Sequence, residues 1–172
     1  MLINAYGLFW RADEVNWRGK KRGPKFRLLG RIGATKPGLR LADFRTQSGL
    51  YILYGDYGPY YVGLTQEARL GSRLAAHKLR DQHKGKWDRF SWFGFRKVRR
   101  KAEADGMCHL MTLALGPRSN PRREIADMEA LLIKALGLQS NLRQEDFKEA
   151  DQWTQVKLLE TDMYLRKVRP RS

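Results

Sequence analysis

Two tyrosines, an arginine and a histidine near the middle of this sequence have the side-chain types that phosphate chemistry requires. Tyr51 and Tyr61 lie ten residues apart, each within a short run of aromatic and β-branched residues. Arg73 and His77 are four residues apart, so on a helix their side chains would lie on the same face. An arginine can neutralise charge that develops on a phosphate, and a tyrosine or a histidine can move a proton. These four residues could therefore support hydrolysis of a phosphodiester bond.

Glu129 is a carboxylate at a position where the helical spacing predicts an apolar side chain. It lies four residues after Ile125 and three before Leu132, on a stripe that continues to Leu136. An ionised carboxylate is costly on such a stripe unless it is paired with a cation. A buried ion pair with an arginine would explain Glu129, and so would a position at the edge of the stripe or a bound divalent metal ion. The spacing alone allows all three interpretations.

Local patterns predict the elements that would position the tyrosines, the arginine and the histidine. Residues 50–54 and 60–62 are typical of strands, and the glycines, aspartate and proline between them predict a β-hairpin. If residues 56–58 form the loop, the two tyrosines share one face of the sheet. A helix is expected over residues 68–81, where it would carry the arginine and the histidine.

Further along the chain, a third strand, the helix of Glu129 and a last helix are predicted. The third strand is expected over residues 90–95. The helix of Glu129 has a suitable N-cap, first position and C-terminal stop in Asn120, Pro121 and Gly137. The last helix is expected from about residue 144 to residue 167, followed by a basic tail.

Composition divides the chain into a basic N-terminal extension (1–44), a core (45–141) and a C-terminal helical arm with a basic tail (142–172). The extension is rich in glycine, which predicts strands and loops. Basic residues beside glycine suit contact with phosphate, and a solvated loop would explain them equally well. Two basic clusters are the candidate nucleic-acid contacts: Lys20, Lys21, Arg22 and Lys25 in the extension, and Arg96, Lys97, Arg99, Arg100 and Lys101 in the core.

The charge balance favours an acidic polymer as partner. The chain has 34 basic and 18 acidic residues among 172, a formal net charge of +16, yet its 42% hydrophobic content is too high for a disordered polycation. An anionic membrane surface would explain only the charge, and no apolar run approaches the roughly 20 residues needed to span a bilayer. Cys108 is the only cysteine, which excludes an internal disulfide and a multi-cysteine zinc site. We therefore expect a cytoplasmic protein that binds DNA.

An ordered set of residues resembles the GIY-YIG nuclease family. Gly49-Leu50-Tyr51 followed by Tyr61-Val62-Gly63 is similar to the two halves of the family signature. The family then has a helix with an arginine and a histidine one turn later, a helix with a glutamate in an apolar run, and a closing asparagine, which are matched in order by Arg73, His77, Glu129 and Asn141. The resemblance covers residues 49–141. It departs at Leu64, where several family members carry lysine.

The resemblance implies an α+β fold with a small central antiparallel sheet flanked by helices, here with an N-terminal strand-and-loop extension and a C-terminal helix. It implies that Glu129 is the sole protein ligand of one Mg²⁺ or Mn²⁺ ion. Tyr51 would be the general base for the attacking water, His77 would adjust its proton, and Arg73 would stabilise the transition state. The two remaining matched residues would position water or phosphate and order the site, namely Tyr61 and Asn141.

The function that follows from the resemblance is divalent-metal-dependent endonucleolytic cleavage of DNA. A stand-alone restriction or defence endonuclease fits best, because the chain has no recognisable zinc finger, helix-turn-helix or second catalytic domain. A mobile-element or repair nuclease is an alternative within the family, and a homodimer would allow both strands to be cut. The alternative from another class is a basic nucleic-acid-binding protein that cleaves nothing.

Overall fold

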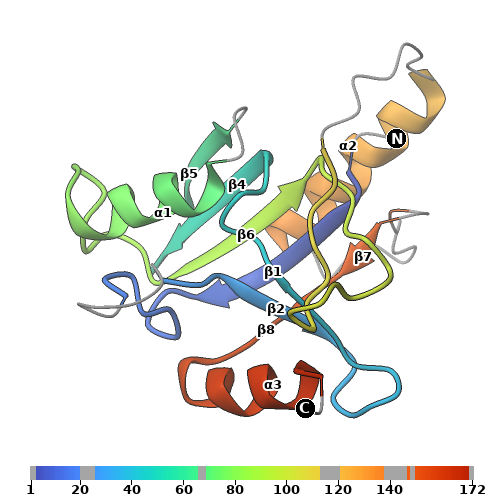
Figure 1. The fold of residues 1–172 in the computed structure, drawn as a ribbon. Coiled ribbons are helices and arrows are strands. Elements are labelled where there is room, and N and C mark those ends of the chain that lie inside the picture. The colour runs from blue at the N-terminus through green and yellow to red at the C-terminus, as the bar shows by residue number, and fades with distance from the viewer. Residues whose placement is uncertain are drawn as a thin grey trace.

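The computed structural model describes residues 3–19, 26–65, 69–112, 121–137, 147 and 150–170, with the side chains of all of these except 121–126. Figure 1 shows a larger sheet crossing the molecule and a smaller sheet below it. The elements in chain order are β1 (Ala5–Arg11), β2 (Leu29–Ile32), β3 (Arg40–Asp43), β4 (Gly49–Gly55), β5 (Gly58–Thr65), α1 (Leu70–Leu79), β6 (Arg89–Gly94), α2 (Pro121–Leu136), β7 (Asp151–Gln152), β8 (Thr154–Gln155), the 3-10 helix η1 (Leu158–Glu160) and α3 (Thr161–Val168).

The larger sheet contains five strands in the order β5-β4-β6-β1-β7. The hairpin β4–β5 and the third strand β6 are antiparallel, which confirms the predicted hairpin and the predicted strand at residues 90–95. Strand β1 is antiparallel to β6, and β7 lies parallel to β1. The fold class is therefore α+β, but the larger sheet is mixed rather than wholly antiparallel, because a C-terminal strand joins its edge.

Strand β4 separates two hydrophobic clusters because its side chains alternate between the faces of the sheet. Tyr51 and Leu53 belong to the first cluster, which also contains Trp92 and the rings around it. Ile52 and Tyr54 belong to the second. All four β4 side chains are buried, so both faces of this strand are covered.

A different helix covers each face of the larger sheet (Figure 1). Helix α1 confirms the prediction at residues 68–81 and packs Leu70 and Leu74 into the first cluster. Helix α2 begins at Pro121 as predicted and places Ala130 and Ala135 in the second cluster. Within the part of the chain that the structure describes, no helix combines the length and the apolar character needed to cross a bilayer.

The smaller sheet joins segments from the two ends of the sequence. Its strand order is β3-β2-β8, and helix α3 lies below it (Figure 1). A third hydrophobic cluster connects β2 and β3 to α3, through Leu29, Leu41, Tyr164 and Val168. The segments before residue 45 and after residue 150 are thus paired with each other.

The N-terminal segment forms the predicted strands but belongs to the core, whereas the C-terminal segment differs from its predicted helix. The first 44 residues supply β1 to the middle of the larger sheet and β2 and β3 to the smaller one, because Trp10 and Leu28 are core residues. The predicted last helix is wrong over residues 151–160, which form two short strands and η1, and α3 begins only at Thr161. Trp153 determines this extended course, since its side chain is 1% exposed and its backbone N–H donates to Tyr6 O at 2.8 Å.

Candidate active site

Tyr51 and Tyr61 face the same side of the larger sheet, as the sequence predicts. The turn of the hairpin is one residue shorter than expected, with Gly55 paired to Gly58. A bulge compensates, because Tyr54 pairs with Pro59 and Leu53 with Tyr61, leaving Tyr60 as the extra residue. The two tyrosine rings consequently lie 6.2 Å apart, centroid to centroid.

Helix α1 brings His77 to the hydroxyl of Tyr51. Leu70 and Leu74 are completely buried against the sheet, and His77 follows them on the same stripe with 4% of its surface exposed. Its Nε2 lies 2.8 Å from Tyr51 Oη, and its Nδ1 lies 2.5 Å from Asp81 Oδ2. A continuous hydrogen-bonded chain thus runs from the phenol through the imidazole to a carboxylate.

The directions of these two hydrogen bonds follow from the charges of the groups. Burial lowers the pKa of His77 below its ordinary value of 6.5, although Asp81 opposes this effect, so the imidazole is neutral at neutral pH. Burial acts to raise the pKa of Asp81, but hydrogen bonds from the His83 backbone and from His77 outweigh it and lower the pKa. An ionised carboxylate only accepts, so His77 Nδ1–H donates to Asp81 and His77 Nε2 accepts the Tyr51 proton.

Tyr51 donates a hydrogen bond to His77 and stays protonated at neutral pH. Burial, together with the neighbouring Tyr61, raises the pKa of Tyr51 to about 12, whereas Arg73 acts to lower it. The order phenol, imidazole, carboxylate resembles the nucleophile, base and orienting carboxylate of a hydrolase triad. Tyr51 has no exposed surface, while Arg73 is exposed and Tyr61 is partly exposed, so these two form the open side of the group.

Gly63 provides the space that the Tyr51 ring occupies. Gly63 pairs directly with Tyr51 in the hairpin, and a Cβ atom there would lie 2.2 Å from Tyr51 Cζ and 2.3 Å from Tyr51 Oη. Gly49, the other signature glycine, has φ +151°, and a Cβ there would meet Phe93 O at 2.0 Å. The glycines at the two ends of the signature are therefore required sterically.

We expect Gly63→Ala to lower the free energy of unfolding by about 1–3 kcal/mol, because an added methyl must displace a buried ring. Gly38→Ala is the matched control, since its Cβ would meet nothing closer than 3.9 Å. Urea denaturation of both variants, followed by far-UV circular dichroism, measures the difference. Equal stability of the two variants would contradict the packing described for Tyr51.

The structure does not bring Glu129 to this group of residues. Glu129 belongs to α2, which packs on the opposite face of the sheet, where Tyr54 Oη donates to Ala135 O at 2.8 Å. Its side chain is exposed, and Leu132 and Leu136 are 55% and 51% exposed. The prediction of a buried stripe is wrong here, because α2 turns its alanines toward the sheet. The role of Glu129 as a metal ligand stays a prediction that rests on the resemblance.

The structure describes only some of the other predicted site residues. Asn141 and the first basic cluster (Lys20, Lys21, Arg22 and Lys25) lie outside the described residues. Lys97, Arg99, Arg100 and Lys101 are exposed and could contact a phosphate backbone, although Arg99 also pairs with Glu103 at 3.7 Å. Arg96 differs from them, because its guanidinium bonds the carbonyls of Thr46 and Met111 at 2.7 Å each. We assign Arg96 to the structure of this loop.

Sequence reasoning missed Asp81 and His83. One carboxylate oxygen of Asp81 accepts the hydrogen bond from His77 Nδ1–H. The other oxygen accepts a hydrogen bond from the His83 backbone N–H at 2.9 Å. The His83 ring lies 4.5 Å from the Tyr61 ring and 4.8 Å from the His77 ring. Asp81 follows His77 at the helical spacing of four residues, and that spacing could have indicated the pair. The fold of residues 81–86 was needed to place His83.

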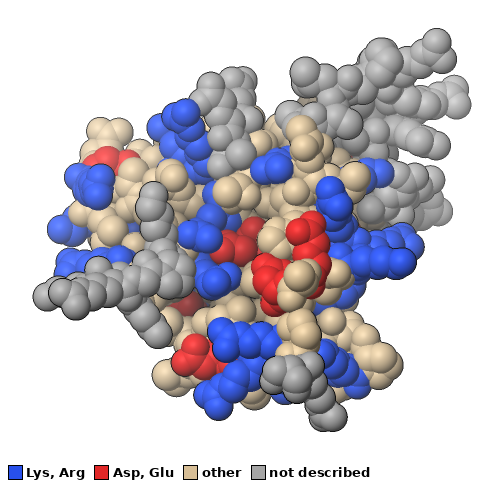
Figure 2. Space-filling view, in the orientation of Figure 1, with Lys and Arg blue, Asp and Glu red and all other residues tan. Residues whose placement is uncertain are grey.

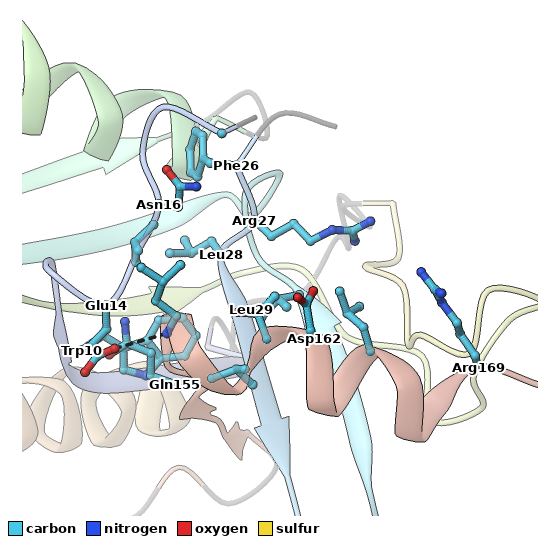
Figure 3. A pocket seen from close by; sticks show the side chains of 16 residues that line it. Trp10, Glu14, Asn16, Phe26, Arg27, Leu28, Leu29, Gln155, Asp162 and Arg169 are labelled. Carbon is cyan, nitrogen blue, oxygen red and sulfur yellow. Dashed lines mark hydrogen bonds between the residues drawn. The ribbon is translucent and has the colours of Figure 1, made fainter. Parts of the chain in front are cut away.

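The large cavity in Figure 3 lies elsewhere. It has a volume of about 400 Å³ and lies between the segment after β1, the start of β2 and helix α3. Trp10, Phe26 and Leu28 are among its apolar lining residues, with Arg27 and Arg169 among the charged ones. None of the predicted site residues that the structure describes lines this cavity. The candidate active site lies instead beside α1, where Tyr51 and His77 are buried and Arg73 is exposed.

Comparison of the chain with protein-family models, with curated proteins and with solved structures gave no match in any of the three.

Proposed function

We propose that this chain is a DNA endonuclease that hydrolyses phosphodiester bonds at the Tyr51 face of the larger sheet. The observation that carries the proposal is the chain from Tyr51 through His77 to Asp81, beside the exposed guanidinium of Arg73. An acid–base pair next to a fixed positive charge is the combination that phosphodiester hydrolysis uses. The formal charge of +16 supports a polyanionic substrate.

In the proposed reaction a backbone phosphate contacts Arg73 and Tyr61 on the open side of the site. His77 Nε2 accepts the Tyr51 proton, and Asp81 stabilises the imidazolium that forms. The Tyr51 phenolate takes a proton from the attacking water, whose oxygen forms the new bond to phosphorus. The leaving oxygen departs with the electrons of the broken P–O bond and takes a proton from solvent, and the His77 imidazolium releases its proton to solvent, which restores the starting state. Because Tyr51 has no exposed surface, DNA binding must open a path for water to its hydroxyl.

The divalent ion of this proposal rests on the family resemblance alone. Glu129 is exposed on α2, and α2 and Tyr51 are on opposite faces of the sheet, so Glu129 does not fit the role of a metal ligand beside Tyr51. We therefore derive no step through an ion held by Glu129. The assignment to restriction or defence rests on the same resemblance.

More than one basic surface of the molecule could contact DNA. Figure 2 shows lysine and arginine side chains in several groups around one face, with an acidic group between them. A distribution of this kind suits contact with phosphates of a duplex and gives no sequence readout by itself. The exposed cluster formed by Lys97, Arg99, Arg100 and Lys101 is the described candidate for such contact.

The test is incubation of purified protein with end-labelled single-stranded and duplex DNA, with Mg²⁺ or Mn²⁺ and with or without chelator. We expect internal cleavage by the parent chain, and cleavage slower by roughly 10²-fold or more in Tyr51→Phe purified in parallel, which controls for contaminating nucleases. Equal cleavage by both preparations would assign the activity to a contaminant or to another site.

One observation favours the non-catalytic alternative, a basic nucleic-acid-binding protein. Tyr51 has no exposed surface and a pKa raised to about 12, which is also the condition of a structural hydroxyl. This alternative predicts DNA retention in a gel shift and intact DNA under every metal condition.

A further inference from the structure

His77, Asp81 and His83 place three metal-binding side chains together at the end of α1. One ligand atom from each of them lies within 4.8 Å of the other two. The chain contains only three histidines, and two of them meet here with their ring planes 88° apart. The third histidine, His109, is exposed on another loop.

The local fold holds these side chains near one another before any ligand binds. Helix α1 ends at Leu79, and Asp81 then holds the backbone N–H of His83, which turns the chain back toward the helix. His77 is 4% exposed and His83 is 9% exposed, and the ring of Tyr61 packs against His83. The Asp81 side chain is 35% exposed and leaves the group open to solvent on one side.

The donor chemistry selects one class of ion. Two imidazoles and one carboxylate suit Zn²⁺ and its first-row neighbours, whereas Mg²⁺ and Ca²⁺ prefer oxygen ligands throughout. Donor atoms about 2.0–2.1 Å from a tetrahedral Zn²⁺ lie ~3.4 Å from one another, so a pair of donor atoms at the 4.8 Å limit would have to approach by roughly 1.4 Å. A fourth position would be left for water, as in open zinc sites.

We propose that His77, Asp81 and His83 bind a late first-row divalent cation, such as Zn²⁺ or Co²⁺. The ion takes one ring nitrogen from each histidine and one oxygen from Asp81. Because Asp81 and His77 otherwise bond each other, an ion held by both replaces the hydrogen bond that orients His77 toward Tyr51. This site is distinct from the predicted Glu129 site, because Glu129 lies on the helix that covers the other face of the sheet.

Titration of the protein with Co²⁺ alone, followed by visible absorption and by isothermal calorimetry, tests the site directly. We expect one ion per chain, and at least about tenfold weaker binding in both His83→Gln and Asp81→Asn. His109→Gln is the matched control, since His109 also pairs with an aspartate, Asp105, at 2.9 Å but is exposed. Its binding should equal that of the parent chain.

Three results would overturn the site: no saturable binding by the parent chain, unchanged binding in His83→Gln, or equal loss in His109→Gln.

Thermal unfolding with and without Zn²⁺ gives a measurement on the parent chain that needs no variant, and we expect the ion to raise the midpoint. An unchanged midpoint at saturating Zn²⁺ would also contradict the proposal.

A second arm rests on the proposed nuclease function. An ion on His77 and Asp81 removes the proton acceptor of Tyr51, so Zn²⁺ should slow cleavage by the parent chain. The ratio of rates with and without Zn²⁺ should lie closer to one in His83→Gln than in the parent. If Co²⁺ binds as expected but no preparation cleaves DNA, the metal site stands and the nuclease proposal fails.

Discussion

Tyr51→Phe should reduce single-turnover cleavage of DNA by roughly 10²-fold or more, the usual scale for loss of a general base. The substitution keeps the ring that packs over Gly63 and removes only the hydroxyl, which donates a hydrogen bond to His77. The variant should still fold. Its free energy of unfolding should fall by about 1 kcal/mol, because His77 Nε2 loses its hydrogen-bond donor. Affinity for DNA should be nearly unchanged, since Tyr51 has no exposed surface.

The matched control for this variant is Tyr57→Phe, because Tyr57 is fully exposed at the hairpin turn. Quenched-flow cleavage of a labelled duplex at saturating protein gives both rates. A Tyr51→Phe rate equal to that of Tyr57→Phe would remove Tyr51 from the mechanism. Metal-bound hydroxide would then be the stronger candidate for the attacking group.

Arg73→Ala should slow cleavage by about 10²–10³-fold, the scale seen when one group that stabilises transition-state charge is removed. Arg73 is exposed and opposes the rise in the pKa of Tyr51 that burial causes. It is therefore placed to contact both the phosphate and Tyr51, the proposed base. Its exposure also means that the free energy of unfolding should change little. The effect should therefore appear in the rate of the bound complex and not in the amount of folded protein.

Arg80→Ala is the control for Arg73, because Arg80 is an exposed arginine at the C-terminal end of the same helix. Both variants lose one positive charge, so equal losses of cleavage would assign Arg73 to general attraction of DNA. A large loss only in Arg73→Ala, partly restored in Arg73→Lys, would support contact with the reacting phosphate.

Local sequence signals were sufficient for the hairpin, for α1 and for β6. The β-branched and aromatic runs around Tyr51 and Tyr61 define strands whose alternation decides which residues share a face. The shared face was predicted from the wrong loop length, and the bulge at Tyr60 restored it. Leu70 and Leu74 then fixed which side of α1 meets the sheet, and with it the position of His77.

Tertiary contacts decided what the sequence could not show. Glu129 and Leu132 follow a helical stripe, but the opposite side of α2, with Ala130 and Ala135, packs on the sheet. Small side chains allow close approach, and periodicity of large apolar residues does not detect them. The C-terminal segment is similarly extended because Trp153 enters the core between distant strands.

The most direct measurement of the central claim is a double-mutant cycle on the single-turnover cleavage rate, using Tyr51→Phe, Asp81→Asn and the double variant. Asp81 is connected to Tyr51 through His77, by hydrogen bonds of 2.5 Å and 2.8 Å. Groups that act as one unit have non-additive effects. We predict that Asp81→Asn slows the parent chain but leaves the rate of Tyr51→Phe unchanged. Multiplication of the two losses in the double variant would contradict the account, because it would show that Tyr51 and Asp81 act independently.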